Sequence, residues 1–183
     1  MNIILASQSP RRKELMSLFG RPFTVRVADI DETMDPQKTP FEEVARVSRM
    51  KAQAVKPMPG ELVIAADTIV VCDGEILGKP KNEADAFRML HMLSGNTHQV
   101  MTGLTVLGGG KQVSVTEVTH VRFRELTKDE IEAYIATGEP MDKAGSYGIQ
   151  GGAALFVSRL EGDYFNVMGL PVCKLGMILK EFL

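Results

Sequence analysis

The chain has 183 residues, 44% of them apolar, which suits one substantial hydrophobic core and leaves little room for two ordinary domains. We therefore expect a single domain over residues 1–183. Lys and Arg number 21 against 23 Asp and Glu, so no global positive field favours nonspecific binding to nucleic acid or anionic lipid. Any phosphate chemistry must then come from a local cluster of cations.

The cysteines and the N-terminus indicate where the protein works. Cys72 and Cys173 have neither metal-ligand nor redox spacing, so we interpret both as spectator thiols of a reducing compartment. The apolar residues 3–6 are too few for the core of a signal peptide. No later segment approaches the length of a membrane span. We expect a cytoplasmic protein without nucleic-acid or membrane partners.

The N-terminal pattern predicts a strand, a tight turn and a helix. Residues 2–6 are an apolar run, and a helical pattern follows over residues 10–19. Ser9 suits the N-cap, Pro10 the first helical position and Gly20 the C-terminal stop. The residues expected on the buried face of this helix are Leu15, Leu18 and Phe19.

A strand and a second helix are predicted next. Residues 23–30 alternate well enough to be a strand that leads into the acidic pair at positions 31 and 32. Thr39 and Pro40 are an N-cap and first-turn proline pair, and the helix they begin should run to about Val55.

The central part of the chain carries further strands and a third helix. Residues 62–72 are mostly apolar and β-branched, as in a strand covered on both faces, and residues 73–74 (Asp-Gly) signal a hairpin turn. Asn82 caps a third helix that Gly95 ends.

The C-terminal half completes the pattern. Residues 98–107 and 112–123 predict an antiparallel pair joined by three glycines, and Thr127 with Glu130 forms the capping box of a fourth helix. The remaining expected elements are a glycine-rich loop over residues 140–152, short strands over residues 153–157 and 164–167, and a helix opened by Pro171. The pattern predicts an α/β fold, a mixed twisted sheet flanked by helices.

Residues 7–12 (Ser-Gln-Ser-Pro-Arg-Arg) have a direct use in anion binding. A helix N-terminus offers unpaired N–H groups and partial positive charge. Arg11 and Arg12 oppose that dipole, which is more easily understood if an anion accepts bonds from both guanidinium groups. Ser7 and Ser9 can add hydroxyl donors. A capped helix with two solvated arginines explains the same residues equally well.

Lys51 and Asp67 stand in apolar surroundings. Lys51 shares a helical stripe with Val44 and Val55, so it either follows the edge of the core or meets a phosphate or carboxylate there. Asp67 lies in the middle of the most apolar strand, where a carboxylate needs a cation, a metal or good donors. A catalytic carboxylate fits this position, and so does an Asp at a strand break that bonds nearby amides.

The sequence allows two interpretations of Lys79 and two of the acidic pair Asp31 and Glu32. Lys79 follows the hairpin after the strand of Asp67, so it either returns to the same end of the sheet or is a surface lysine. Asp31 and Glu32 are either a solvated turn or a second carboxylate site for a metal. Magnesium needs few protein ligands when a triphosphate supplies others.

No P-loop, dinucleotide fingerprint, His-rich metal motif or nucleophile elbow is present. His91, His98 and His120 are isolated, and we interpret them as structural or surface residues. The remaining inventory of arginines, lysines, carboxylates and a glycine-rich loop suits a polyphosphate bound with a metal ion.

In order along nearly the whole chain, the segments resemble the Maf, or septum-formation-inhibitor-like, nucleoside triphosphate pyrophosphatases. The matching stretches are residues 5–12, 66–70, 77–80, 93–95 with His98, 142–151 and 169–171. The resemblance implies an elongated α/β fold similar to inosine triphosphatases, cleavage between the α- and β-phosphates with Mg²⁺ or Mn²⁺, and a possible homodimer.

The resemblance also implies roles for single residues. Asp67 would be the base that activates water, and Glu32 would help Asp67 hold the metal. The cations that would bind the triphosphate are Arg11, Arg12, Lys51 and Lys79, with Ser7 and Ser9 beside them. The run over residues 143–151 is similar to the branch that acts on dTTP and UTP, in which Arg12, Thr68 and Gln150 set substrate choice.

Three hypotheses follow. The first is a metal-dependent pyrophosphatase that converts dTTP and UTP, and modified pyrimidine nucleotides, to the monophosphate and pyrophosphate. The second is a nucleotide-binding regulator of cell division or septum formation without turnover. Such a sensor has little need of Asp67 beside a polyanion, whose repulsion the carboxylate would increase unless a metal intervenes. The third is a purine-directed enzyme on the same fold.

Overall fold

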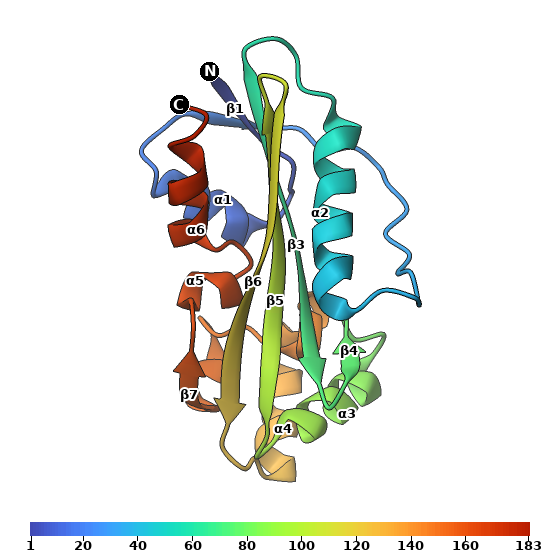
Figure 1. Cartoon of the computed structure of the whole chain (residues 1–183). Coiled ribbons are helices and arrows are strands. Elements are labelled where there is room, and N and C mark those ends of the chain that lie inside the picture. The colour runs from blue at the N-terminus through green and yellow to red at the C-terminus, as the bar shows by residue number, and fades with distance from the viewer. The chain divides into compact units, whose positions relative to one another are not determined.

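The computed structural model describes all 183 residues, and its strands form one mixed sheet (Figure 1). The strands are β1 (Asn2–Leu5), β2 (Phe23–Val25), β3 (Glu61–Cys72), β4 (Glu75–Leu77), β5 (Thr97–Gly108), β6 (Lys111–Phe123) and β7 (Val157–Glu161). Their order is β2-β1-β3-β5-β6-β7, and β4 pairs with β3. The predicted α/β class, a mixed sheet flanked by helices, is confirmed.

The helices follow the predicted caps. They are α1 (Pro10–Ser17), α2 (Pro40–Val55), α3 (Glu83–Leu93), α4 (Lys128–Ala136), α5 (Tyr164–Val167) and α6 (Val172–Leu179), with short 3-10 turns η1 (Glu139–Asp142), η2 (Ala144–Ser146) and η3 (Gly152–Leu155). Thr39 and Thr127 both form complete capping boxes, which satisfy amides that a helix start leaves unpaired. No helix is both long and apolar enough to cross a membrane.

Contacts within the chain group into two compact units. The first comprises Met1–Thr68, Thr102–Glu117 and Phe165–Leu183, and the second comprises Ile69–Met101 and Val118–Tyr164. Strands β3, β5 and β6 each contribute residues to both units.

In the first unit, β1 is parallel to both β2 and β3. Helix α2 packs against one face of these strands, while α1 and α6 lie on the other (Figure 1). The α2 side includes Ile4 and Ala6 from β1 and its end, Val63 and Ala65 from β3, and Ala52 from α2. These strand residues alternate because successive side chains point to opposite faces.

In the second unit, buried rings surround His98. Its Nε2 lies 2.7 Å from the hydroxyl of Tyr147, and its ring meets that of Phe123 edge to face. Burial lowers the pKa of His98 to about 4, so the imidazole is neutral near pH 7. His98 therefore has the structural place that the sequence indicated.

Three expectations about local structure were wrong. The strand predicted over residues 23–30 ends at Val25, because its partner β1 ends at Leu5, opposite Val25, and Arg26 turns to pair with Glu61. Helix α1 ends at Ser17, which leaves Leu18 63% exposed and puts Met16 in the core instead.

The third error concerns the segment before α6. Residues 164–167 form the short helix α5, and residues 152–155 form the turn η3, where strands were predicted. Short apolar runs do not distinguish the two states by periodicity. The N–H of Gly169 bonds the carbonyl of Asn166 and the N–H of Leu170 bonds that of Phe165, so this segment closes on itself.

Gly103 in β5 permits the closest approach of α2 to the sheet. A Cβ at this position would lie 2.0 Å from the carbonyl oxygen of Val44. We expect Gly103→Ala to lower the free energy of unfolding by about 1–3 kcal/mol, because α2 must move to admit a methyl group. Urea denaturation measures this change.

The matched control is Gly176→Ala in α6, whose added Cβ would meet Phe19 at 3.6 Å, an ordinary contact. A helix-interior alanine should be neutral or stabilising by up to about 1 kcal/mol. Equal stabilities of the two variants would contradict the assigned packing of α2.

Candidate active site

Arg12, on α1, is held by three hydrogen bonds beside the end of β1 and the middle of β3. Its Nε donates to the carbonyl of Gly169 at 2.7 Å, Nη1 to Oγ of Ser7 at 3.3 Å and Nη2 to Oγ1 of Thr68 at 3.0 Å. Burial lowers the pKa of Arg12, and the negative charge of Asp67 opposes that shift. An arginine nevertheless stays charged in proteins, so this is a fixed cation.

The start of α1 offers further groups to an anion. Ser9 is the N-cap, and its hydroxyl accepts from the N–H of Arg12 at 3.5 Å, a long and therefore weak bond. Arg11 is partly exposed and forms no side-chain hydrogen bond or ion pair. Its charge is thus available to a ligand, as the anion-site interpretation of residues 7–12 requires.

Asp67, Lys51 and Glu32 form one charged cluster. Nζ of Lys51, on α2, lies 2.8 Å from Oδ1 of Asp67 on β3 and 3.0 Å from Oε2 of Glu32. The side chains of Lys51 and Asp67 are 16% and 15% exposed. The partly buried carboxylate of Asp67 therefore has the cation that its position demands, and Lys51 ends at a carboxylate instead of merely following the core.

The donor set of this cluster fits a divalent ion. Glu32 and Asp67 present hard carboxylate oxygens around Lys51, whose single positive charge balances only one of the two negative charges. No third His, Cys, Asp or Glu joins them in a metal-holding group. Mg²⁺ and Mn²⁺ accept one or two carboxylates when phosphates and water supply the other ligands, so an ion here would depend on oxygens from a bound polyphosphate.

Two hydroxyl groups near Arg12 have opposite hydrogen-bonding states. Oγ of Ser7 accepts from both the N–H of Ser9, at 3.2 Å, and Arg12. Both lone pairs are then used, and the hydroxyl hydrogen is left to donate. Ser7 is 7% exposed, so a donor at this depth needs an acceptor.

Thr68 is arranged the other way. Thr102, fully buried in β5, donates to the carbonyl of Asn166 at 3.2 Å and lies 2.9 Å from Oγ1 of Thr68. A carbonyl only accepts, so Thr102 uses its hydrogen there, and Thr68 must donate to Thr102 while accepting from Arg12. What Thr68 has left to offer a ligand is a lone pair.

The structure brings eight of the ten predicted site residues into the first unit: Ser7, Ser9, Arg11, Arg12, Glu32, Lys51, Asp67 and Thr68. Lys79 and Gln150 belong to the second unit, where both are exposed. Their predicted roles stay predictions.

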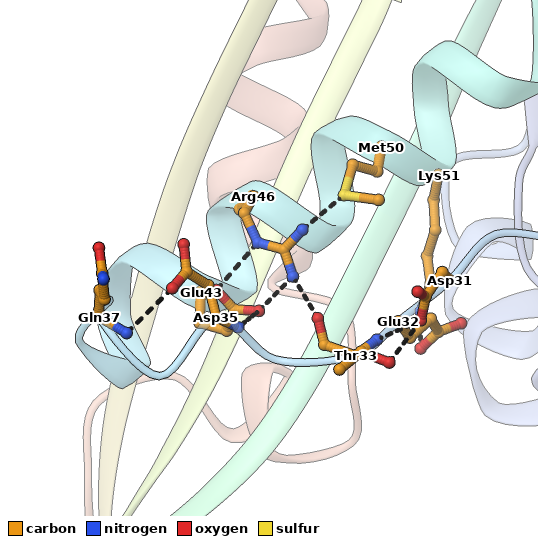
Figure 2. A network of polar contacts seen from close by, with 9 residues as sticks. All are labelled: Asp31, Glu32, Thr33, Asp35, Gln37, Glu43, Arg46, Met50 and Lys51. Atoms are coloured by element: carbon orange, nitrogen blue, oxygen red, sulfur yellow. Dashed lines mark hydrogen bonds and ion pairs between the residues drawn. The ribbon is translucent and has the colours of Figure 1, made fainter.

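Other residues of the site were not found from the sequence. Thr102 gave no signal, because threonine is an ordinary residue of strands. The sequence explains Glu43 as an acid favoured by the helix dipole, yet its side chain is only 2% exposed and pairs with Arg46. The polar contacts of this pair, which reach residues 33 and 35, appear in Figure 2.

Together these features define an α/β protein with cations gathered beside the end of β1 and the middle of β3, and with a carboxylate pair next to them. The model of the Maf-like protein family matches residues 2–182. The chain belongs to the Maf-like family, and the resemblance seen in the sequence motifs is confirmed.

Relatives in this family are similar over their whole length. A protein of Bacillus cereus named dTTP/UTP pyrophosphatase is 50% identical over 181 residues, covering 98% of this chain and 95% of that protein. A protein of the same name from Bacillus thuringiensis subsp. konkukian is 49% identical with the same coverage.

Among solved structures, a HAM1 protein from Coxiella burnetii has a similar fold. The TM-score is 0.58 and 99% of each chain is covered, at 15% sequence identity. At 15% identity, this similarity shows a shared fold and nothing further.

Proposed function

We propose that this chain hydrolyses dTTP and UTP, and modified pyrimidine nucleotides of the same shape, to the monophosphate and pyrophosphate. The observation that carries the proposal is the partly buried carboxylate of Asp67, which shares Lys51 with Glu32, in a chain 50% identical to a protein named dTTP/UTP pyrophosphatase. A sensor that bound nucleotides without a metal ion would gain repulsion, not affinity, from that carboxylate.

In the reaction Asp67 accepts a proton from a water molecule, whose oxygen attacks the α-phosphorus. The bond between that phosphorus and the bridging oxygen breaks, and the bridging oxygen leaves with pyrophosphate. Lys51 lies beside Asp67. When substrate binds, its ammonium group can leave the carboxylates and pair with phosphate oxygens instead. A divalent ion held by Glu32 and Asp67 would neutralise charge that develops on the phosphate oxygens.

The cations bind the triphosphate in this proposal. Arg11 has no competing partner in the chain, and Arg12 keeps two N–H groups beyond the three that it uses. Ser7 can donate its hydroxyl hydrogen to a phosphate oxygen, which only accepts. Ser9 and Lys79 complete the set that we assign to the phosphates.

We assign substrate choice to Arg12, Thr68 and Gln150. Because Thr68 offers only a lone pair, it is unsuited to a phosphate oxygen and suited to a donor, such as the N3–H of uracil or thymine. Cytosine has no hydrogen on N3. The amide of Gln150 can both donate and accept along a pyrimidine edge.

The first test is Asp67→Asn. We expect pyrophosphate release from dTTP or UTP, with Mg²⁺ or Mn²⁺ present, to fall about 10²–10⁴-fold because the amide is no base. Binding of an α,β-methylene analogue of UTP should persist. Release is measured by phosphate-product analysis over a nucleotide panel that includes ITP.

Asp73→Asn, in the exposed turn after β3, makes the same chemical change away from the cluster and should leave activity unchanged. Equal turnover in Asp67→Asn would overturn its role as base. Binding without turnover in the unaltered protein would favour a regulator, and preference for ITP would favour the purine-directed alternative.

The second test is Thr102→Val, which removes the acceptor that holds the Thr68 hydrogen. Thr68 could then donate to the N3 of cytosine, so we expect the ratio of kcat/KM for UTP over CTP to fall about tenfold or more, the value of one good hydrogen bond. Thr102→Ser keeps the hydroxyl and should keep the ratio. An unchanged ratio in a folded Thr102→Val protein would refute the assignment of Thr68.

A further inference from the structure

The segment between β2 and α2, residues 26–39, carries Glu32 but contains no helix or strand. Connections of this length without secondary structure are uncommon in compact domains and usually serve a function. A carboxylate on an untethered segment would sample many positions, and fixing it at a metal would cost conformational entropy. The geometry of Glu32 must therefore come from contacts that hold the segment in place.

One anchor lies at the start of the segment. Arg26 makes two parallel bonds to Glu61 at the start of β3, Nη1 to Oε2 at 2.8 Å and Nη2 to Oε1 at 2.6 Å. These bonds hold the pKa of Glu61 at about 2. Paired bonds of this kind fix orientation as well as distance, so the segment leaves the sheet in a defined direction.

The second anchor is Arg46 on α2 (Figure 2). Its Nη2 donates to the carbonyl of Thr33 at 2.8 Å, and its Nε donates to Oε2 of Glu43 at 2.9 Å. Oε1 of Glu43 in turn accepts the N–H of Asp35 at 3.1 Å. The hydrogen bonds from Arg46 lower the pKa of the buried Glu43, which therefore stays charged. Two backbone groups of the segment are thus tied to one turn of α2.

Glu32 lies between the two anchors. It directly precedes Thr33, whose carbonyl Arg46 holds, and its own carboxylate reaches Lys51 on the same helix. Helix α2 therefore fixes both the backbone beside Glu32 and the cation that its carboxylate meets. Asp67 meets that cation from β3.

Arg46 uses four of its five N–H groups inside the chain, which leaves at most one for a substrate. All three guanidinium nitrogens already donate inside the chain, to Glu43, to Thr33 and, through Nη1, to Sδ of Met50 at 2.8 Å. Its charge is balanced by Glu43, which is 2% exposed. A phosphate that accepted more than one N–H of Arg46 would have to break this network.

We propose that Arg46, with Glu43, is a positioning residue that presents the carboxylate of Glu32 to the divalent ion. This inference rests on the proposed function for the role of the ion, and it assigns to Arg46 an effect on metal affinity that acts entirely through Glu32. Contacts that orient metal ligands are typically worth 10–100-fold in metal affinity.

The test compares Arg46→Met, Arg46→Lys and Glu32→Gln, alone and with Arg46→Met added to Glu32→Gln. Mn²⁺ binding is measured by electron paramagnetic resonance with α,β-methylene-UTP present, and the Mn²⁺ concentration for half-maximal pyrophosphate release is measured beside it. We expect Arg46→Met to weaken both about tenfold, with a smaller change in kcat at saturating Mn²⁺. Arg46→Lys should recover part of the affinity, because one amine reaches either Thr33 or Glu43.

The Glu32→Gln background separates positioning from a general structural role. There, adding Arg46→Met should change Mn²⁺ affinity by less than about twofold, since coupled residues are not additive. Arg88→Met is the matched control: Arg88 pairs with Asp85 one turn away, as Arg46 does with Glu43, and with Glu75. It should leave Mn²⁺ affinity unchanged.

Additive losses in the double variant, or a fall in kcat without a change in Mn²⁺ affinity, would overturn the proposal. Hydrogen exchange distinguishes a failure of the positioning role of Arg46 from a failure of the proposed function. If the unaltered protein releases no pyrophosphate, the proposed function fails, while Mn²⁺ binding and the exchange of the Asp35 amide still decide the positioning role. Arg46→Met should speed that exchange, and unchanged exchange would refute the anchor.

Discussion

The site depends on the alternation of side chains along β3. Val63, Ala65 and Asp67 have the same parity, and the first two pack in the core beneath α2, so Asp67 meets Lys51 on that helix. Thr68 points the opposite way and meets Arg12 on α1. Two neighbouring residues of one strand thereby join helices on both faces of the sheet. A shift of register by one residue would exchange the two faces and destroy both contacts.

In the protein without ligand, Lys51, Asp67 and Glu32 stabilise one another by ion pairing. Asp67 is tolerated in the strand because Lys51 pairs with it, and Lys51 is held at the same time by Glu32. Removing one member of such a pair leaves the other charge without a partner and without its full hydration, which destabilises the protein. When a polyphosphate binds with a metal ion, these partners are exchanged. The metal ion can then bind the carboxylates while Lys51 binds the phosphates, so every charged group still has a partner of opposite charge.

Much of the fold was predictable because its signals are local. The bounds of α2 follow from the N-cap and proline pair at Thr39 and Pro40 and from the residue before Pro57, and β3 follows from a long apolar run. Asp67 was recognisable because a charge in such a run must have a partner. By contrast, the short strand β2 depends on β1, which is distant in sequence, and the four residues of α5 are too few for periodicity to distinguish helix from strand. Local patterns gave the wrong result for both.

The partners of the site residues were less predictable for the same reason. Arg12 and the carbonyl of Gly169 are 157 residues apart, and a backbone carbonyl has no residue type to reveal it. Arg46 looked like any arginine on an amphipathic helix, although its partners at residues 33 and 35 lie in a segment without a periodic pattern. Sequence motifs indicated which residues carry charge to the site, and only the contacts show which ones hold the others in place.

The hydroxyl groups show how the fold can select chemistry without adding charge. Ser7 and Thr68 both bond Arg12, yet one is left as a donor and the other as an acceptor. The difference comes from their second partners: the N–H of Ser9 donates to Ser7, whereas Thr102, committed to a carbonyl, accepts from Thr68. The hydroxyl of Ser7 is thus left to donate to a phosphate oxygen, and that of Thr68 is left to accept from a hydrogen-bond donor. Backbone groups that no substrate needs to touch set this difference.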